Sequence, residues 1–133
     1  MSNGIEKIIE KLRNTKRTFI REYLSNDKCG RCLEGVIADR IIPKDILQDH
    51  WTLGGLVDSE PVYYGERLKQ IYGIEFRDVY DNVVKCVKCN ESFKSLEGIL
   101  THINDVHAYN HKDNADILEE LHKEYDLING VRK

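Results

Sequence analysis

The sequence predicts a small α+β fold, and three of its features support this. Apolar residues recur every three or four positions near both termini, which is the spacing of amphipathic helices. Short β-branched stretches bounded by turn residues lie in the middle of the chain, as is typical of strands. Four cysteines form two C-x-x-C pairs, Cys29/Cys32 and Cys86/Cys89. We therefore expect two small cysteine-based ββα units flanked by an N-terminal and a C-terminal helix.

The composition is that of a globular chain that contains no membrane span. The 133 residues suffice for one domain or for two small modules that share a core. No apolar run approaches the roughly 18–20 residues that cross a bilayer. The charged N-terminus lacks the apolar core of a signal peptide, so we expect an intracellular protein that is not secreted. In a reducing compartment, C-x-x-C pairs are more often metal sites than disulfides.

The elements are expected in a definite order along the chain. They are a basic amphipathic helix at 1–27, a divergent metal knuckle at 28–55, a helix–strand connection at 56–84, a second knuckle at 85–108 and a C-terminal helix at 109–133. The apolar stripe of the first helix runs from Ile5 to Leu24, and that of the last from Ile117 to Ile128.

Turn residues and short apolar runs predict the elements of the middle region. Residues 36–42 read as a strand, and Pro43 suits the start of a helix over 44–51 that Gly54-Gly55 would end. Residues 66–72 read as a helix that stops at Gly73. A strand is then expected within 74–80.

Charge is distributed unevenly along the chain. The formal net charge of −3 argues against a polycation that coats nucleic acid. Residues 1–31 nevertheless hold 8 Lys/Arg against 4 Asp/Glu. Contacts to phosphate groups are therefore expected chiefly from this N-terminal segment.

The second cysteine pair belongs to a longer pattern. Twelve residues separate Cys89 from His102, and four separate His102 from His107. Two cysteines on a hairpin turn and two histidines on one helix face can direct four ligands at a tetrahedral Zn²⁺. The five-residue step between the histidines requires the last helical turn to loosen slightly. Cys86, Cys89, His102 and His107 are therefore predicted to bind zinc.

Residues 84–107 resemble the two-Cys/two-His zinc-finger family. Besides the four ligands, the aromatic Phe93 and the apolar Ile99 lie where the family has its small core. The resemblance implies a ββα unit folded around Zn²⁺ and a helix that enters the major groove of duplex DNA.

The residues at the base-reading positions implied by this resemblance are poorly suited to reading. These positions fall on Ser95, Glu97, Gly98 and Thr101. None is the Arg, Asn or Gln that bidentate base contacts need, so we expect weak sequence readout with Ser95 and Thr101 as the candidate contacts. Affinity is expected instead from phosphate contacts by Lys16, Arg17, Arg21, Lys85, Lys88 and Lys94.

A shift of 57 residues aligns the first cysteine pair with the second. The aligned candidate ligands are Cys29, Cys32, Asp45 and His50, with Asp45 in the place of the first histidine. Because a carboxylate can ligate zinc, these four are predicted to form a divergent second site. His111 and His122 are the alternatives for its fourth ligand. We expect two zinc ions per chain, and at least one.

A weaker resemblance is to HNH endonucleases, in which two C-x-x-C pairs share one zinc. The family's D-H-x-x-P-like element corresponds to residues 39–43, and Asn82 precedes the second pair. Arg40 stands where the general-base histidine would be, and a guanidinium cannot accept a proton near neutral pH. This resemblance implies a catalytically degenerate nuclease fold with a four-cysteine zinc site.

The leading functional prediction is a zinc-dependent, non-enzymatic DNA-binding protein that regulates transcription. The alternatives are a zinc-stapled protein-interaction module, which includes self-association through the terminal helices, and the degenerate HNH-like fold. Double-stranded DNA is the expected partner.

Overall fold

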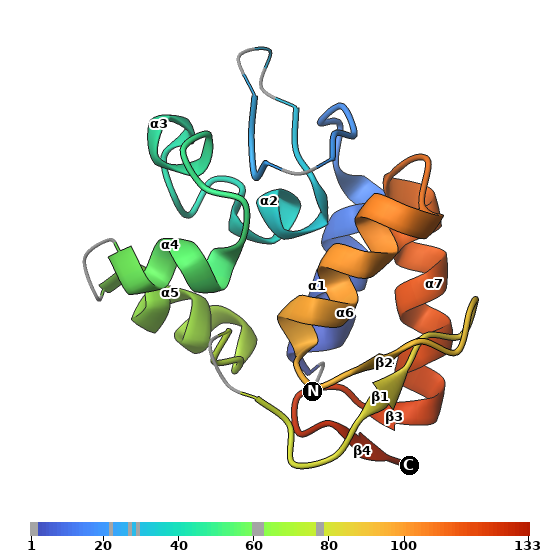
Figure 1. Cartoon of the computed structure of the whole chain (residues 1–133). Helices are drawn as coiled ribbons and strands as arrows, with labels where there is room; N and C mark the ends of the chain where they lie inside the picture. Colours follow the sequence, from blue (N-terminus) through green and yellow to red (C-terminus); the bar gives the residue numbers. More distant parts are fainter. Residues whose placement is uncertain (1–2, 22, 27, 29, 60–62, 77–78) are drawn as a thin grey trace.

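Seven α-helices and two short β-hairpins make up the described part of the fold (Figure 1). The computed structural model describes residues 3–21, 23–26, 28, 30–59, 63–76 and 79–133. The helices are α1 (Gly4–Asn14), α2 (Leu33–Ala38), α3 (Lys44–Leu47), α4 (Leu53–Ser59), α5 (Tyr63–Tyr72), α6 (Leu96–His102) and α7 (His111–Glu124), with one π-helical turn, η1 (Ile103–His107). The strands are β1 (Val84–Lys85), β2 (Ser92–Phe93), β3 (Tyr125–Asp126) and β4 (Val131–Arg132).

The two terminal helices pack against each other inside the chain, side by side in Figure 1. Each begins at an asparagine cap: Asn3 accepts from the amide of Glu6, and Asn110 accepts from the amide of Asp113. The apolar stripes predicted for both helices are buried in the common core. Arg13 of α1 also pairs with two carboxylates of α7.

The N-terminal helix is shorter than predicted, because it ends at Asn14 rather than near residue 27. Thr15 has extended backbone angles, and the chain then follows an irregular path. Backbone bonds from Ile20 to the Arg31 carbonyl (3.1 Å) and from Arg31 to the Thr18 carbonyl (2.8 Å) hold this path in place. Ile20 and Leu24 are shielded by tertiary packing rather than by a helix face.

The strand predicted over 36–42 is wrong. Residues 36–38 belong to α2, all six residues of which are buried, and residues 39–42 form the turn that follows it. Gly54 and Gly55 lie inside α4 rather than ending the preceding helix, and α3 stops at Leu47. The prediction that Gly73 ends the next helix is confirmed, since Gly73 follows α5 with a left-handed φ of 69°. The described residues of 74–80 form no strand.

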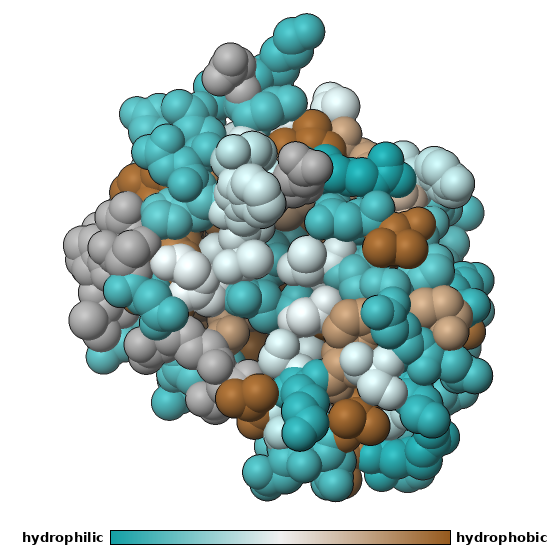
Figure 2. Space-filling model, viewed as in Figure 1, coloured by the Kyte–Doolittle hydropathy of each residue, from teal (hydrophilic) through white to brown (hydrophobic). Residues whose placement is uncertain are grey.

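The two hairpins lie next to each other at the lower end of the view in Figure 1. Val84 pairs with Phe93 in the first, and Tyr125 pairs with Arg132 in the second. The Lys85 amide donates to the Tyr125 hydroxyl at 3.4 Å and so joins them. The face seen in Figure 2 is mostly hydrophilic, with apolar residues scattered singly or in small groups. No helix in the described ranges has the length and apolar character needed to cross a membrane.

Candidate metal centre

Cys86, Cys89, His102 and His107 form the one cluster of metal-ligating side chains found in the described part of the chain. Their sulfur and imidazole nitrogen atoms all lie within 4.8 Å of one another. His102 Nε2 is 3.3 Å from Cys89 Sγ and 3.0 Å from His107 Nε2. Ligand atoms of a tetrahedral zinc site are about 3.3–3.8 Å apart, since the bonds measure about 2.0–2.3 Å. The cluster therefore has nearly the dimensions of a zinc coordination shell.

The hairpin turn between β1 and β2 positions the two cysteines. The Cys86 amide donates to the Glu91 carbonyl and the Asn90 amide to the Cys86 carbonyl, both at 2.9 Å. Asn90 has a left-handed φ of 63°, a conformation that asparagine tolerates better than most residues. The Lys88 amide donates to Cys86 Sγ at 3.4 Å and thereby stabilises negative charge on that sulfur.

A π-helical turn brings the two histidines together. In a regular α-helix, residues five apart point in different directions, because one turn takes 3.6 residues. After His102 the helix widens into η1, and the Ala108 amide donates to the Ile103 carbonyl, five residues earlier, at 2.9 Å. The loosened last turn expected from the histidine spacing is thus confirmed. Such π-turns occur frequently at functional sites.

The surroundings of His102 favour the neutral imidazole that a metal requires. Burial, and secondarily His107, lower the pKa of His102. Glu91 lies 3.7 Å from His102 Nδ1, on the side of the ring away from Cys89, where a carboxylate can orient the ring. The Phe93 ring packs on the imidazole with centroids 4.6 Å apart. Burial also raises the pKa of Cys86, so a bound cation is what would favour its thiolate.

The predicted second site is not assembled by the described residues. Cys29 lies outside them, and Cys32, Asp45 and His50 form no cluster with one another. Cys32 is instead the N-cap of α2, where its sulfur accepts from the Gly35 amide at 3.4 Å. Burial raises the pKa of the Cys32 thiol to about 12, so this cysteine favours the neutral form.

The alternative fourth ligands lie elsewhere. The His111 ring is buried against Phe19, with centroids 5.6 Å apart. His122 Nε2 is 3.5 Å from a Glu6 carboxylate oxygen. Neither histidine belongs to a metal-ligating cluster within the described residues.

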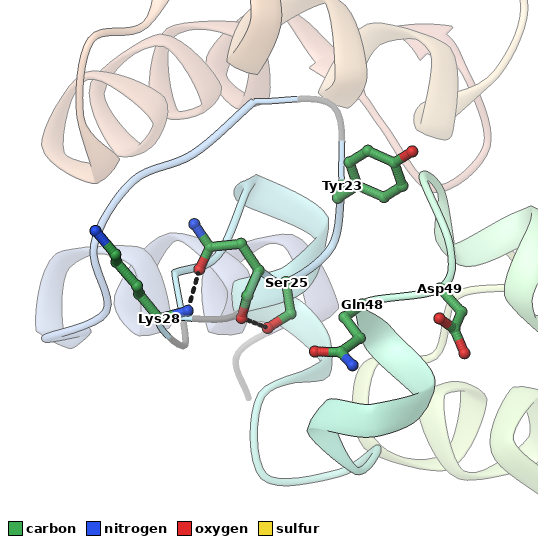
Figure 3. A pocket seen from close by; sticks show the side chains of 6 residues that line it. Tyr23, Ser25, Lys28, Gln48 and Asp49 are labelled. Atoms are coloured by element: carbon green, nitrogen blue, oxygen red, sulfur yellow. Dashed lines mark hydrogen bonds between the residues drawn. The ribbon is translucent and has the colours of Figure 1, made fainter.

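A pocket of about 530 Å³ lies between the segment around Ser25 and the residues that follow α3 (Figure 3). It is lined by Tyr23, Ser25, Asn26, Lys28, Gln48 and Asp49. The Asn26 side-chain oxygen accepts from the amides of Lys28 (3.1 Å) and Gly30 (2.8 Å). Where the structure describes it, this region is thus a hydrogen-bonded loop rather than a shell of metal ligands.

The HNH-like arrangement gains no support from the geometry. Cys32 does not join Cys86 and Cys89, which cluster with histidines instead. Asp39 is held by two guanidinium groups, 3.1 Å from Arg17 and 3.4 Å from Arg31. Arg40 has a left-handed φ of 68° at the surface.

The side chains at the base-reading positions are engaged within the protein. Ser95 caps α6 by accepting from the Gly98 amide at 2.9 Å. Glu97 accepts from the Gly54 amide of α4. Thr101 donates to the buried Glu34 of α2 at 2.9 Å. Glu97 and Thr101 therefore face α4 and α2, and the Ser95 hydroxyl has its partner within α6.

The predicted phosphate-contacting residues differ in availability. Lys16, Lys85, Lys88 and Lys94 are exposed. Arg17 is half-buried beside Asp39. Arg21 donates to the Ala108 carbonyl at 2.7 Å and lies over the ring of Tyr109. The two arginines thus have structural partners that the sequence did not reveal.

Sequence reasoning missed Glu34, a carboxylate that is only 2 % exposed. Burial and the nearby Glu97 raise its pKa well above the usual value. It accepts from Thr101 and from the Leu53 amide, and it therefore links α2 to α4 and α6. Nothing in the local pattern distinguishes Glu34 from a surface carboxylate, because its burial depends on helices that are distant in sequence.

Comparisons of this chain with protein-family models, with curated proteins and with solved structures found no match. The functional conclusion therefore depends on the geometry of the chain itself.

Proposed function

We propose that this chain is a non-enzymatic zinc protein in which one structural Zn²⁺ fastens the β1–β2 hairpin to α6 and η1. The convergence of four ligand atoms within 4.8 Å carries the proposal. Two cysteines and two histidines suit zinc, and four protein ligands leave no open position for a substrate or an attacking water. The metal would contribute folding free energy, because the β1–β2 hairpin has only two paired residues per strand.

Zinc content of the purified chain tests this proposal. Elemental analysis after dialysis should give one zinc per chain, and His102→Ala should remove it. His50→Ala is the matched control, since His50 is the aligned histidine of the first knuckle and is expected to leave zinc content unchanged. Loss of zinc in the His50 variant with retention in the His102 variant would reverse the assignment.

Duplex DNA binding is the second part of the proposal, and it is favoured by the exposed lysines around the hairpin and after α1. Because α6 turns its reading face inwards, affinity would come from phosphate contacts rather than from base edges. Two unrelated duplexes should then bind within about threefold of each other, whereas site-specific reading discriminates by about 10³-fold or more. A large preference for one sequence would contradict this mode of binding and would favour a transcriptional regulator.

A further inference from the structure

A basic cleft lies at the C-terminal end of α1, remote in sequence from the metal centre. Its cavity of about 610 Å³ is lined by four cationic side chains, Lys11, Lys16, Arg17 and Arg40, and by one carboxylate, Asp39. These residues come from α1, from the irregular segment after it and from the end of α2. The cleft therefore exists only in the folded chain.

The acidic group in the cleft is already compensated. Asp39 is 3.1 Å from Arg17 and 3.4 Å from the buried Arg31. Lys11 donates to the carbonyls of Ile37 (3.1 Å) and Asp39 (2.8 Å), so it anchors α1 to the end of α2. Lys16 and Arg40 are exposed, and neither forms an ion pair within the described residues. A surplus of positive charge thus faces solvent in the cleft.

A second cavity of about 410 Å³ shares two lining residues with the cleft, Thr15 and Arg17. In the second cavity, Arg13 pairs with Asp116 and Glu119 of α7. Lys112 also lines this cavity and lies 3.6 Å from Asp116, so its positive charge is compensated as well. Because they share lining residues, the two cavities adjoin, and we refer to them together as the basic groove. Its charge surplus is concentrated around Lys16 and Arg40, and several separate cations suit the repeated phosphates of a polyanion.

We propose that this groove binds the phosphate backbone of double-stranded nucleic acid, with Lys16 and Arg40 as its principal contacts. The inference rests on the DNA-binding part of the proposed function and not on the metal centre. The main DNA-binding surface would then lie at this groove, and Lys85, Lys88 and Lys94, on and beside the β1–β2 hairpin, would contribute less to affinity.

Two substitutions remove the charge while preserving the fold. Arg40→Gly places glycine at a left-handed φ of 68°, which glycine adopts without strain, so folding should be unaffected or improved. Lys16→Ala removes an exposed side chain. Lys123→Ala is the matched control, because Lys123 is exposed beside His122, which faces Glu6 at the opposite end of α1.

The test is fluorescence anisotropy of the full zinc-loaded chain with a labelled mixed-sequence duplex. At about 50 mM salt the Lys16→Ala/Arg40→Gly variant should bind about tenfold more weakly than the unmodified chain, and the slope of log K against log[salt] should become shallower by about 1.8. The Lys123 variant should match the unmodified chain. Equal affinity of the double variant would overturn the groove while leaving DNA binding in place, and no binding by the unmodified chain would overturn both.

Inorganic phosphate distinguishes a polyanion groove from a site for a small anion. Phosphate should displace the duplex no better than a chloride salt of equal ionic strength, because one anion cannot replace several backbone contacts. Displacement by phosphate at far lower ionic strength would overturn the proposal in favour of a free-phosphate site.

Discussion

The two C-x-x-C knuckles share their spacing but differ in structure. The second forms a hairpin that brings its cysteines to His102 and His107. The described residues of the first lead directly into α2, with Cys32 as the helix cap, and they gather no ligands. The same spacing thus occurs with two different local structures, because the residues between the cysteines and those after them decide which way the chain turns.

Two aligned positions account for much of this difference. Asn90 adopts the left-handed conformation that closes the hairpin, whereas the aligned Leu33 is fully buried at the start of α2. Ser92 pairs in β2, whereas the aligned Gly35 lies in α2, where an added Cβ would come within 1.9 Å of the Leu24 carbonyl oxygen. The first knuckle has the residues of a closely packed helix, and the second those of a turn.

The backbone amides at the aligned positions Lys88 and Arg31 also have different partners. At the second knuckle, the Lys88 amide donates to Cys86 Sγ. At the first, the aligned Arg31 amide donates to the Thr18 carbonyl at 2.8 Å. That bond helps to fix the irregular segment after α1, so the Arg31 amide supports the packing of the chain.

Removing one ligand from each knuckle should give the largest difference between them. Cys86→Ser should abolish zinc binding and lower the free energy of unfolding by about 4 kcal/mol, because the metal's contribution to folding is lost. Cys32→Ser should retain zinc and change stability by about 1 kcal/mol, since serine is itself a good helix cap. Urea unfolding and zinc analysis of both variants check this prediction. Equal loss of zinc in the two variants would mean that both knuckles contribute to metal binding.

Gly35→Ala should cause the next largest loss of stability. The added methyl group would meet the Leu24 carbonyl, so α2 must shift, at a cost of about 2–3 kcal/mol in unfolding free energy. Gly55→Ala in α4 is the control, because its Cβ would contact only the Thr52 hydroxyl at 3.1 Å. Thermal unfolding of the two variants measures the difference. Comparable stabilities would mean that α2 does not need this close approach.

Asn90→Leu makes the second knuckle resemble the first at the residue that closes the turn. Leucine at φ 63° should cost about 1–2 kcal/mol and weaken zinc binding accordingly. Asn90→Gly should leave zinc affinity nearly unchanged, because glycine adopts this conformation freely. Competition with a coloured chelator measures both affinities, and an unaffected leucine variant would show that the turn is not decisive.

Substitutions at the aligned positions Glu34 and Glu91 should change the free energy of unfolding least. Unlike the changes above, Glu34→Gln should raise it. Because burial raises the folded-state pKa of Glu34 above its unfolded value of about 4.3, its ionisation favours unfolding. Stability should therefore fall as the pH rises from that unfolded value towards the folded one. Glu34→Gln should remove this decline and gain about 1 kcal/mol at pH 8.

Glu91→Gln is the control for this substitution, because Glu91 is exposed beside His102. Between about pH 5 and pH 8, the free energy of unfolding of that variant should depend on pH as steeply as that of the unmodified chain. An unchanged slope in the Glu34 variant would contradict the burial argument.

The features that local sequence determines were the predictable ones. The Cys/His cluster was predicted because its spacing and its turn residues act over about twenty positions, and the terminal helices were predicted from their apolar stripes. The end of α1 was missed because Phe19 and Ile20 continue the helical spacing by coincidence and pack through an irregular segment. In α2 every residue is buried, so no alternation distinguished helix from strand.

Features that depend on tertiary packing had no signal in the sequence. The sequence predicted Thr101 as a DNA contact. Its partner in the structure, Glu34, lies 67 positions away along the chain, so no local pattern indicates that contact. The basic groove likewise brings together Lys16, which follows α1, and Arg40, which follows α2. Such partners become visible only when the helices are placed.

Zinc K-edge X-ray absorption of the zinc-loaded chain tests the central claim most directly. The structure predicts a first shell of two sulfur and two nitrogen atoms, at about 2.3 Å and about 2.0–2.1 Å, that is lost in His102→Ala. A shell of four sulfur atoms, unchanged by that substitution, would show that the two cysteine pairs share the metal and would contradict the account.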